Sequence, residues 1–115
     1  MNNIILEKLS LWGCDVQGAL ERCVNDENFY IDCLQSFKTD INFEQLKINL
    51  ENKNFEAAFE AAHSLKGVSA NLGITPLFDS ISILVERLRK GYYEDNQKQY
   101  DAIYHDYQYL LDILK

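Results

Sequence analysis

The chain has 115 residues, a net charge of −7 and 47% hydrophobic residues, enough to bury the modest core of one domain over residues 1–115. No apolar run reaches about 18 residues and no basic segment precedes an apolar one, so the sequence predicts neither a membrane span nor a secretory signal. The acidic excess, without a basic cluster, disfavours binding to nucleic acid.

The first part of the chain predicts three short helices. Residues 4–12 carry apolar side chains at helical spacing. Asp15 is placed to cap a second helix over residues 16–24, because a carboxylate at this position accepts from a free backbone N–H group. Asp26 is placed to cap a third helix, whose apolar stripe begins at Phe29.

Two further helices lead to the centre of the sequence. Asp40 restarts or kinks the chain before a helical pattern formed by Phe43, Leu46, Lys47 and Leu50. A longer helix follows over residues 54–72 and ends at Gly73, where glycine suits the left-handed backbone of a helix C-terminus.

The last part of the chain predicts two long helices. Thr75 as N-cap and Pro76 as the first helical residue begin one of them. The other covers residues 94–114, with Tyr104 among its inward-facing side chains. Short connections between amphipathic helices favour antiparallel neighbours. The sequence therefore predicts an all-α fold, an antiparallel four-helix bundle with the short N-terminal helices packed on it.

The helix over residues 54–72 carries a histidine beside its apolar stripe. His63 lies one step from the stripe, so its ring is expected at the solvent edge. Lys66 and Gly67 lie on the same face one turn later, followed by Ala70. The stripe itself consists of Phe55, Ala58, Phe59, Ala62, Leu65, Ser69 and Leu72.

Glycine within a helix costs about 1 kcal/mol relative to alanine, so Gly67 requires an explanation. One explanation is close helix packing, in which the missing side chain admits another backbone. The other is the close approach of a partner protein to His63. The neighbouring His63 and Lys66 favour the second explanation.

These residues resemble the signature of histidine-containing phosphotransfer (HPt) domains. The resemblance extends to residues 13–30 and 50–55 and covers nearly the whole chain. It is carried by the sequence His63-Ser64-Leu65-Lys66-Gly67, followed by Ser69, Asn71-Leu72 and Gly73.

The resemblance implies a phosphorelay carrier. His63 would accept a phosphoryl group from the phospho-aspartate of a response-regulator receiver domain and pass it to a second receiver. Lys66 would meet the phosphoryl oxygens, because a transferring phosphoryl group carries negative charge on its equatorial oxygens. The partner-docking residues would be Glu60, Ser64, Gly67, Ala70 and Asn71, with help from the first short helix.

The resemblance also implies the partners and cofactors. The partners would be receiver domains and a hybrid histidine kinase, and the magnesium ion would belong to the receiver rather than to this chain. We expect no intrinsic cofactor, a monomer, and a cytoplasmic location. The initial methionine favours a free-standing chain over a segment of a larger kinase.

Other chemistries have weaker support. No Walker-type loop, G-x-G-x-x-G or G-x-S-x-G motif occurs, so the phosphoryl group must come from another protein. Glu60 and His63 form a Glu-x-x-His pair, but the second pair that a di-metal bundle requires is missing, since Ala102 precedes His105 at that spacing. The cysteines at 14, 23 and 33 lack C-x-x-C spacing, which predicts free thiols.

One departure from the family pattern concerns the orientation of the His63 ring. Family members often place Gln or Glu on the following helix to hydrogen-bond the second ring nitrogen. That position holds Val85 here, with Glu86 beside it, so Glu86, water or a backbone group would take this role. An alternative function is an HPt-shaped docking module without phosphotransfer; the presence of His63 and Gly67 favours the carrier.

Overall fold

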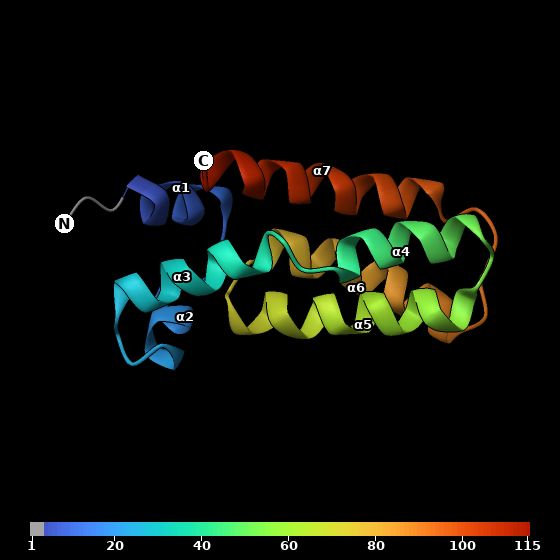
Figure 1. Ribbon diagram of the computed structural model, residues 1–115, viewed down its shortest axis with the longest axis horizontal. Helices are drawn as coiled ribbons and strands as arrows, with labels where there is room; N and C mark the ends of the chain where they lie inside the picture. Colours follow the sequence, from blue (N-terminus) through green and yellow to red (C-terminus); the bar gives the residue numbers. More distant parts are fainter. Residues whose placement is uncertain (1–3) are drawn as a thin grey trace.

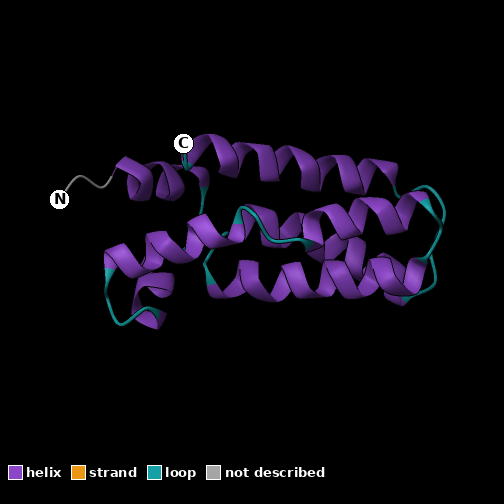
Figure 2. Ribbon diagram, viewed as in Figure 1, coloured by secondary structure: helices purple, strands orange, loops and turns teal. Residues whose placement is uncertain are grey.

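The computed structural model describes residues 4–115, which form seven α-helices and, within that range, no β-strand (Figures 1 and 2). The predicted all-α fold is therefore confirmed. The helices are α1 (Ile4–Trp12), α2 (Val16–Arg22), α3 (Glu27–Phe37), α4 (Asn42–Glu51), α5 (Phe55–Asn71), α6 (Thr75–Arg89) and α7 (Gln97–Ile113).

Helices α4 to α7 run side by side in alternating directions and form the bundle (Figure 1). The closest packing joins α4 to α5, α5 to α6, and α6 to α7. Helix α3 continues the line of α4 beyond a short break, and α1 and α2 lie near the same end of the bundle. The structure is elongated, 46 × 23 × 21 Å. This arrangement matches the predicted bundle with short N-terminal helices.

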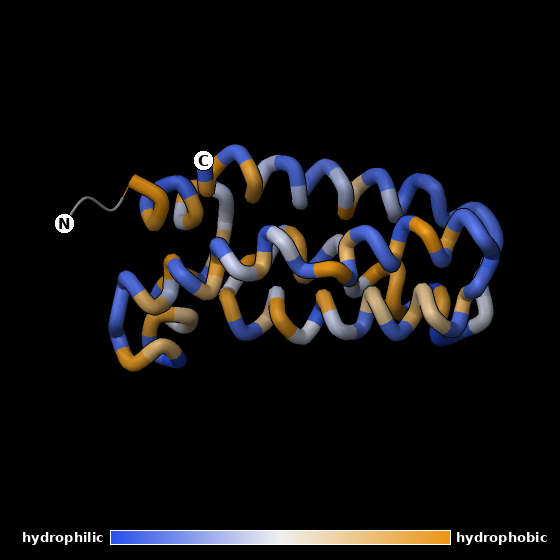
Figure 3. The backbone as a smooth tube through the Cα atoms, in the orientation of Figure 1, coloured by the Kyte–Doolittle hydropathy of each residue, from blue (hydrophilic) through white to orange (hydrophobic). Residues whose placement is uncertain are grey.

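The core forms because apolar and polar positions alternate around each helix at the helical period (Figure 3). Helix α5 lies between α4 and α6 and turns small side chains toward them, since Ala58 and Ala62 are fully buried and Ala61 nearly so. Leu65 continues the same buried face. Small inward residues allow neighbouring helices to approach closely. The opposite face of α5, which neither α4 nor α6 covers, is exposed to solvent.

Several predicted helix ends are confirmed. The Asp15 carboxylate accepts from the Gly18 backbone N–H at 3.0 Å, and the Asp26 carboxylate accepts from that of Phe29 at 3.0 Å. Gly73 has a φ of +70°, as expected for the left-handed residue after a helix.

The Asp40 restart is also confirmed, because its carboxylate accepts from the Asn42 backbone N–H at 2.8 Å. The prediction that Thr75 is an N-cap is wrong. The N-cap is Ile74, because its carbonyl accepts the first helical bond, from the Phe78 backbone N–H at 2.8 Å, so the helix starts at Thr75, one residue earlier than predicted.

Two aromatic residues expected in the core are instead exposed. Tyr104 borders an open groove between α4 and α7 and is 50% exposed. Phe29 lies in the first turn of α3, beside the short helix α2, and is 52% exposed. Both predictions failed because the helical period assigns a face, whereas burial also requires a neighbouring helix to cover it. Within residues 4–115, no helix is long and apolar enough to cross a lipid bilayer.

Candidate functional site

His63 lies in the middle of α5 and is exposed to solvent, as the sequence predicts. Its helix begins at the cap formed by Asn54, whose side chain accepts from the Ala57 backbone N–H. The preceding residue, Ala62, is fully buried, so the helix is anchored directly behind the ring. No described side chain forms a hydrogen bond or an ion pair with His63. Its ring nitrogens are therefore open to an incoming molecule.

Lys66 lies one turn after His63 and is half-buried. Its ammonium nitrogen is 5.7 Å from the centroid of the Phe78 ring on α6, a cation–π contact that restricts its position. Among residues 4–115 it has no carboxylate partner. Its positive charge therefore remains available to a negatively charged group beside His63.

The environment of Gly67 distinguishes the two explanations for this glycine. A Cβ atom built on Gly67 would meet no atom of the described chain within 4 Å beyond its own helix backbone and neighbours. Close packing against another part of the described chain therefore does not account for it. The open space beside His63 is consistent with the approach of a partner.

The predicted docking residues lie on the exposed face of α5. Glu60, Ser64, Ala70 and Asn71 are all exposed. The Ser64 hydroxyl accepts from the Asn42 side chain at 3.2 Å, which links this face to the start of α4. Their role in docking stays a prediction. Helix α1, which was also expected to contribute, contacts α2 and α7, and its part in docking stays a prediction too.

A contact that the sequence analysis missed lies under the His63 ring. The ring stacks on Phe59, with 5.7 Å between centroids and 19° between planes. The residue expected at the orienting position, Val85, is fully buried. Glu86 is exposed and forms an ion pair with Arg89 at 3.0 Å. The four-residue spacing of Phe59 and His63 was a usable signal, because side chains at that spacing meet on a helix.

The C-terminal end of α5 is bonded by residues from the N-terminal segment. Arg22 donates to the carbonyl oxygens of Asn71 at 2.8 Å and Ala70 at 3.0 Å. The buried Tyr30 hydroxyl donates to the Leu72 carbonyl at 2.7 Å. The Asp15 backbone N–H donates to the carbonyl of residue 73 at 2.8 Å. These bonds satisfy carbonyl groups that a helix end otherwise leaves without a partner.

This end of the bundle also shifts the pKa values of two side chains, the buried Tyr30 and the half-buried Cys14. Burial, followed by the nearby Cys14 and Cys23, raises the pKa of Tyr30 well above its ordinary value. Burial raises the pKa of the Cys14 thiol to about 12, against a smaller opposing effect of a backbone hydrogen bond with Thr75. Both groups therefore stay protonated near physiological pH, and the Tyr30 hydroxyl remains a hydrogen-bond donor to the Leu72 carbonyl.

The remaining candidates for chemistry are separate from His63. His105 lies on α7, with its side chain 82% exposed and its Nδ1 atom 3.7 Å from the Asp106 carboxylate. Within residues 4–115, no group of three His, Cys, Asp or Glu side chains is arranged to hold a metal ion. The three cysteine thiols are unpaired.

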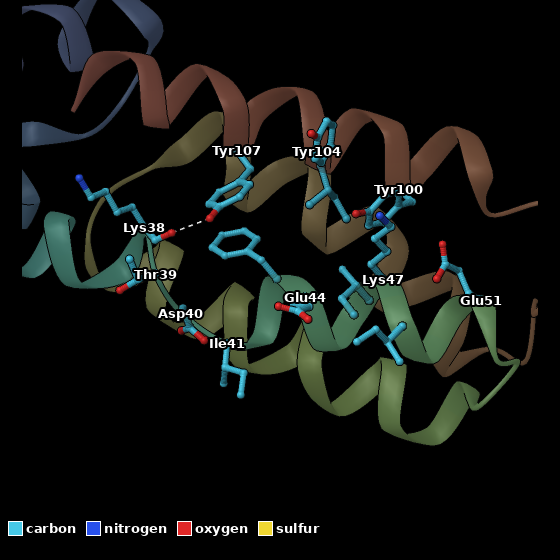
Figure 4. Close-up of a pocket in the computed structure, with 14 residues that line it drawn as sticks. Lys38, Thr39, Asp40, Ile41, Glu44, Lys47, Glu51, Tyr100, Tyr104 and Tyr107 are labelled. Atoms are coloured by element: carbon cyan, nitrogen blue, oxygen red, sulfur yellow. Dashed lines mark hydrogen bonds between the residues drawn. The ribbon is translucent and has the colours of Figure 1, made fainter. Parts of the chain in front are cut away.

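The open groove between α4 and α7 is a cavity of about 680 Å³ and lies away from the predicted site (Figure 4). Tyr100, Tyr104 and Tyr107 line its α7 side, and the Tyr107 hydroxyl donates to the Lys38 carbonyl. Burial raises the pKa of Tyr107 above its ordinary value. None of the predicted site residues lines the cavity. The candidate site therefore lies on the exposed face of α5, apart from this cavity.

The chain was compared with curated proteins, solved structures and protein families. No curated protein and no solved structure matched the chain. A family profile described as Hpt domain matches residues 32–113, which include the whole of α4 to α7. The chain therefore belongs to the Hpt domain family, whose members are phosphorelay carriers in two-component signalling rather than enzymes with ATP-binding motifs.

Proposed function

We propose that this chain accepts a phosphoryl group on His63 from the phospho-aspartate of a receiver domain and passes it to a second receiver. The observation that carries the proposal is the exposed His63 ring, which has open space at Gly67 on one side and the Lys66 cation within one helical turn. An HPt-shaped docking module would require neither an open imidazole nor a nearby cation without a carboxylate partner.

The proposed step moves one phosphoryl group between two side chains. A neutral imidazole carries a lone pair on one ring nitrogen, which attacks phosphorus and forms a P–N bond. The P–O bond to the receiver's aspartate breaks in line, and the carboxylate leaves with the electron pair. Transfer to the second receiver reverses these changes.

The charge of the transferring group explains the role proposed for Lys66. Negative charge is spread over three equatorial oxygens, and positioned cations stabilise it. Lys66 supplies one positive charge from this chain, and a magnesium ion bound by the receiver supplies further positive charge to the phosphoryl oxygens. The chain itself binds no cofactor in this proposal. It acts as a cytoplasmic monomer, and a hybrid histidine kinase is the source of the phosphoryl group.

The test is to mix the chain with a phosphorylated receiver domain and magnesium. We expect a phosphoryl label on the chain that acid removes and base does not, as for a phosphohistidine. Peptide mapping should place it on the segment that contains His63. A chain that forms a stable complex with the receiver but takes up no label would instead support the docking module.

A further inference from the structure

The orientation of the His63 ring has a physical basis in this chain other than a hydrogen bond. The ring stacks on Phe59, one turn earlier in α5, with 5.7 Å between centroids and 19° between planes. This geometry lies within the range of attractive offset stacking. Because side chains of a helix tilt toward its N-terminus, His63 leans toward Phe59 and away from Gly67.

The Phe59 ring is itself held from the neighbouring helix. The guanidinium carbon of Arg89, in the last turn of α6, lies 5.3 Å from the centroid of the Phe59 ring. Arg89 is in turn paired with Glu86 through an Nε–Oε2 distance of 3.0 Å. Phe59 is half-buried between these contacts and the core. A continuous series of contacts thus connects α6 to the His63 ring.

No side chain of α6 within the described structure offers a hydrogen bond to the ring. Val85 is apolar and fully buried. The Ser82 hydroxyl donates to the Phe78 carbonyl at 2.7 Å, and the Glu86 carboxylate is paired with Arg89. Among the hydrogen bonds, ion pairs and ring contacts of residues 4–115, the stacking on Phe59 is the one that involves the His63 ring.

We propose that Phe59 is a positioning residue for phosphotransfer, holding the plane of the His63 ring through stacking. The inference rests on the proposed function of His63. Stacking restricts a ring through its face and leaves both nitrogens free at its edge, where the lone pair lies. In-line attack on phosphorus requires that lone pair to be aimed correctly, so restricting the ring plane increases the fraction of productive encounters.

The experiment compares Phe59→Leu with Phe55→Leu. Phe55 is the matched control, because it is also half-buried on α5 and stacks on Tyr93, at 4.7 Å and 3°, rather than on His63. The first readout is the NMR relaxation order parameter of the His63 Cε1–H bond, which needs no partner protein. The second is the rate of phosphoryl transfer from a saturating phosphorylated receiver.

We expect Phe59→Leu to lower the His63 order parameter and to slow transfer by about threefold to tenfold, as the typical strength of aromatic stacking implies. Phe55→Leu should leave both readouts unchanged, and Phe59→Tyr should restore both. An unchanged order parameter in Phe59→Leu would overturn the stacking role. A lowered order parameter with a normal transfer rate would overturn the positioning role. If the unmodified chain takes up no phosphoryl group, the proposed function fails, whereas the order parameter still tests the stacking.

Discussion

The middle of α5 and its C-terminal end differ in how far the chain satisfies its own polar groups. In the middle, the side chains of His63 and Lys66 have no hydrogen-bond or ion-pair partner within residues 4–115. Gly67 beside them faces open space. At the end, residues 15–30 bond the carbonyl groups of residues 70–73.

This difference separates two roles within one helix. The bonds at the C-terminal end stabilise the fold and hold the helix in place. The side chains of His63 and Lys66 in the middle make ring contacts but no hydrogen bond or ion pair within residues 4–115, so their polar atoms remain free for intermolecular contact. Substitutions in the middle should therefore change phosphotransfer with little loss of stability, and substitutions at the end should do the reverse.

The largest effect is expected from His63→Gln. Glutamine keeps a polar side chain on an exposed helix position but cannot form the phosphohistidine, so uptake of the label should fall to zero. The control is His105→Gln on α7, which should take up label normally. Circular dichroism should show both variants folded. Equal labelling of the two variants would remove the assignment of His63.

At the other region, Tyr30→Phe should destabilise the fold by about 1–3 kcal/mol, because the buried Leu72 carbonyl loses its hydrogen-bond donor. Urea unfolding measures this change. Tyr109→Phe is the control, since Tyr109 is 44% exposed and should change stability by less than about 0.5 kcal/mol. The Tyr30→Phe variant should keep a normal rate of phosphoryl transfer under conditions in which it is folded. A rate about tenfold lower would contradict the division of α5 into a stabilising end and a phosphotransfer region.

A smaller effect is expected from Lys66→Ala, which removes the cation beside His63. Loss of one charge-assisted contact to the phosphoryl oxygens, worth about 1.5 kcal/mol, should slow transfer by about tenfold. Lys66→Arg should retain most of the rate. Lys47→Ala on α4 is the control for general loss of positive charge. If Lys47→Ala slows transfer equally, the effect is one of net charge and not of the site.

Substitutions of Gly67 should leave the fold as stable or more stable, while a large side chain at this position should slow phosphoryl transfer. Gly67→Ala should stabilise the chain by about 1 kcal/mol, because alanine is the better helix former and its Cβ would meet nothing in residues 4–115 within 4 Å beyond the backbone of its own helix and its chain neighbours. Gly67→Gln should also fold well but should accept the phosphoryl group several times more slowly, since its side chain fills the approach to His63. Normal transfer by Gly67→Gln would show that access is not the reason for this glycine.

The smallest effect is a change with alkaline pH in the unfolding free energy that Tyr30 contributes. The pKa of Tyr30 is raised by burial above its unfolded value of 10.0. Because the folded state holds the Tyr30 proton more tightly than the unfolded state, the contribution of Tyr30 to the unfolding free energy is fully present below pH 10. It is lost as the pH rises toward the pKa of Tyr30 in the folded state. The difference in unfolding free energy between the unmodified chain and Tyr30→Phe should therefore narrow between pH 9 and 11. A difference that widens over this range would contradict the raised pKa.

The sequence predicted the parts of the structure that depend on local patterns. The caps at Asp15 and Asp26, the left-handed Gly73 and the exposed His63 all follow from spacing within one or two helical turns. The stacking of His63 on Phe59 was also local, and could have been found by considering four-residue pairs.

The features that could not be predicted depend on how distant segments meet. The Arg22 and Tyr30 side chains bond carbonyl groups more than forty residues away along the chain. No periodicity within a helix contains that information. The exposure of Tyr104 likewise depends on the distance between α4 and α7, which leaves the groove of Figure 4.

The bonds at the end of α5 also bear on where the smallest autonomous fragment can be cut. The family match begins at residue 32, whereas Asp15, Arg22 and Tyr30 all precede it. A fragment trimmed to the matched residues would leave the last turn of the histidine helix frayed, with its carbonyl oxygens dependent on water. Recombinant versions intended for binding or kinetic work should therefore start upstream of residue 15, so that all of these hydrogen bonds to the end of α5 are kept.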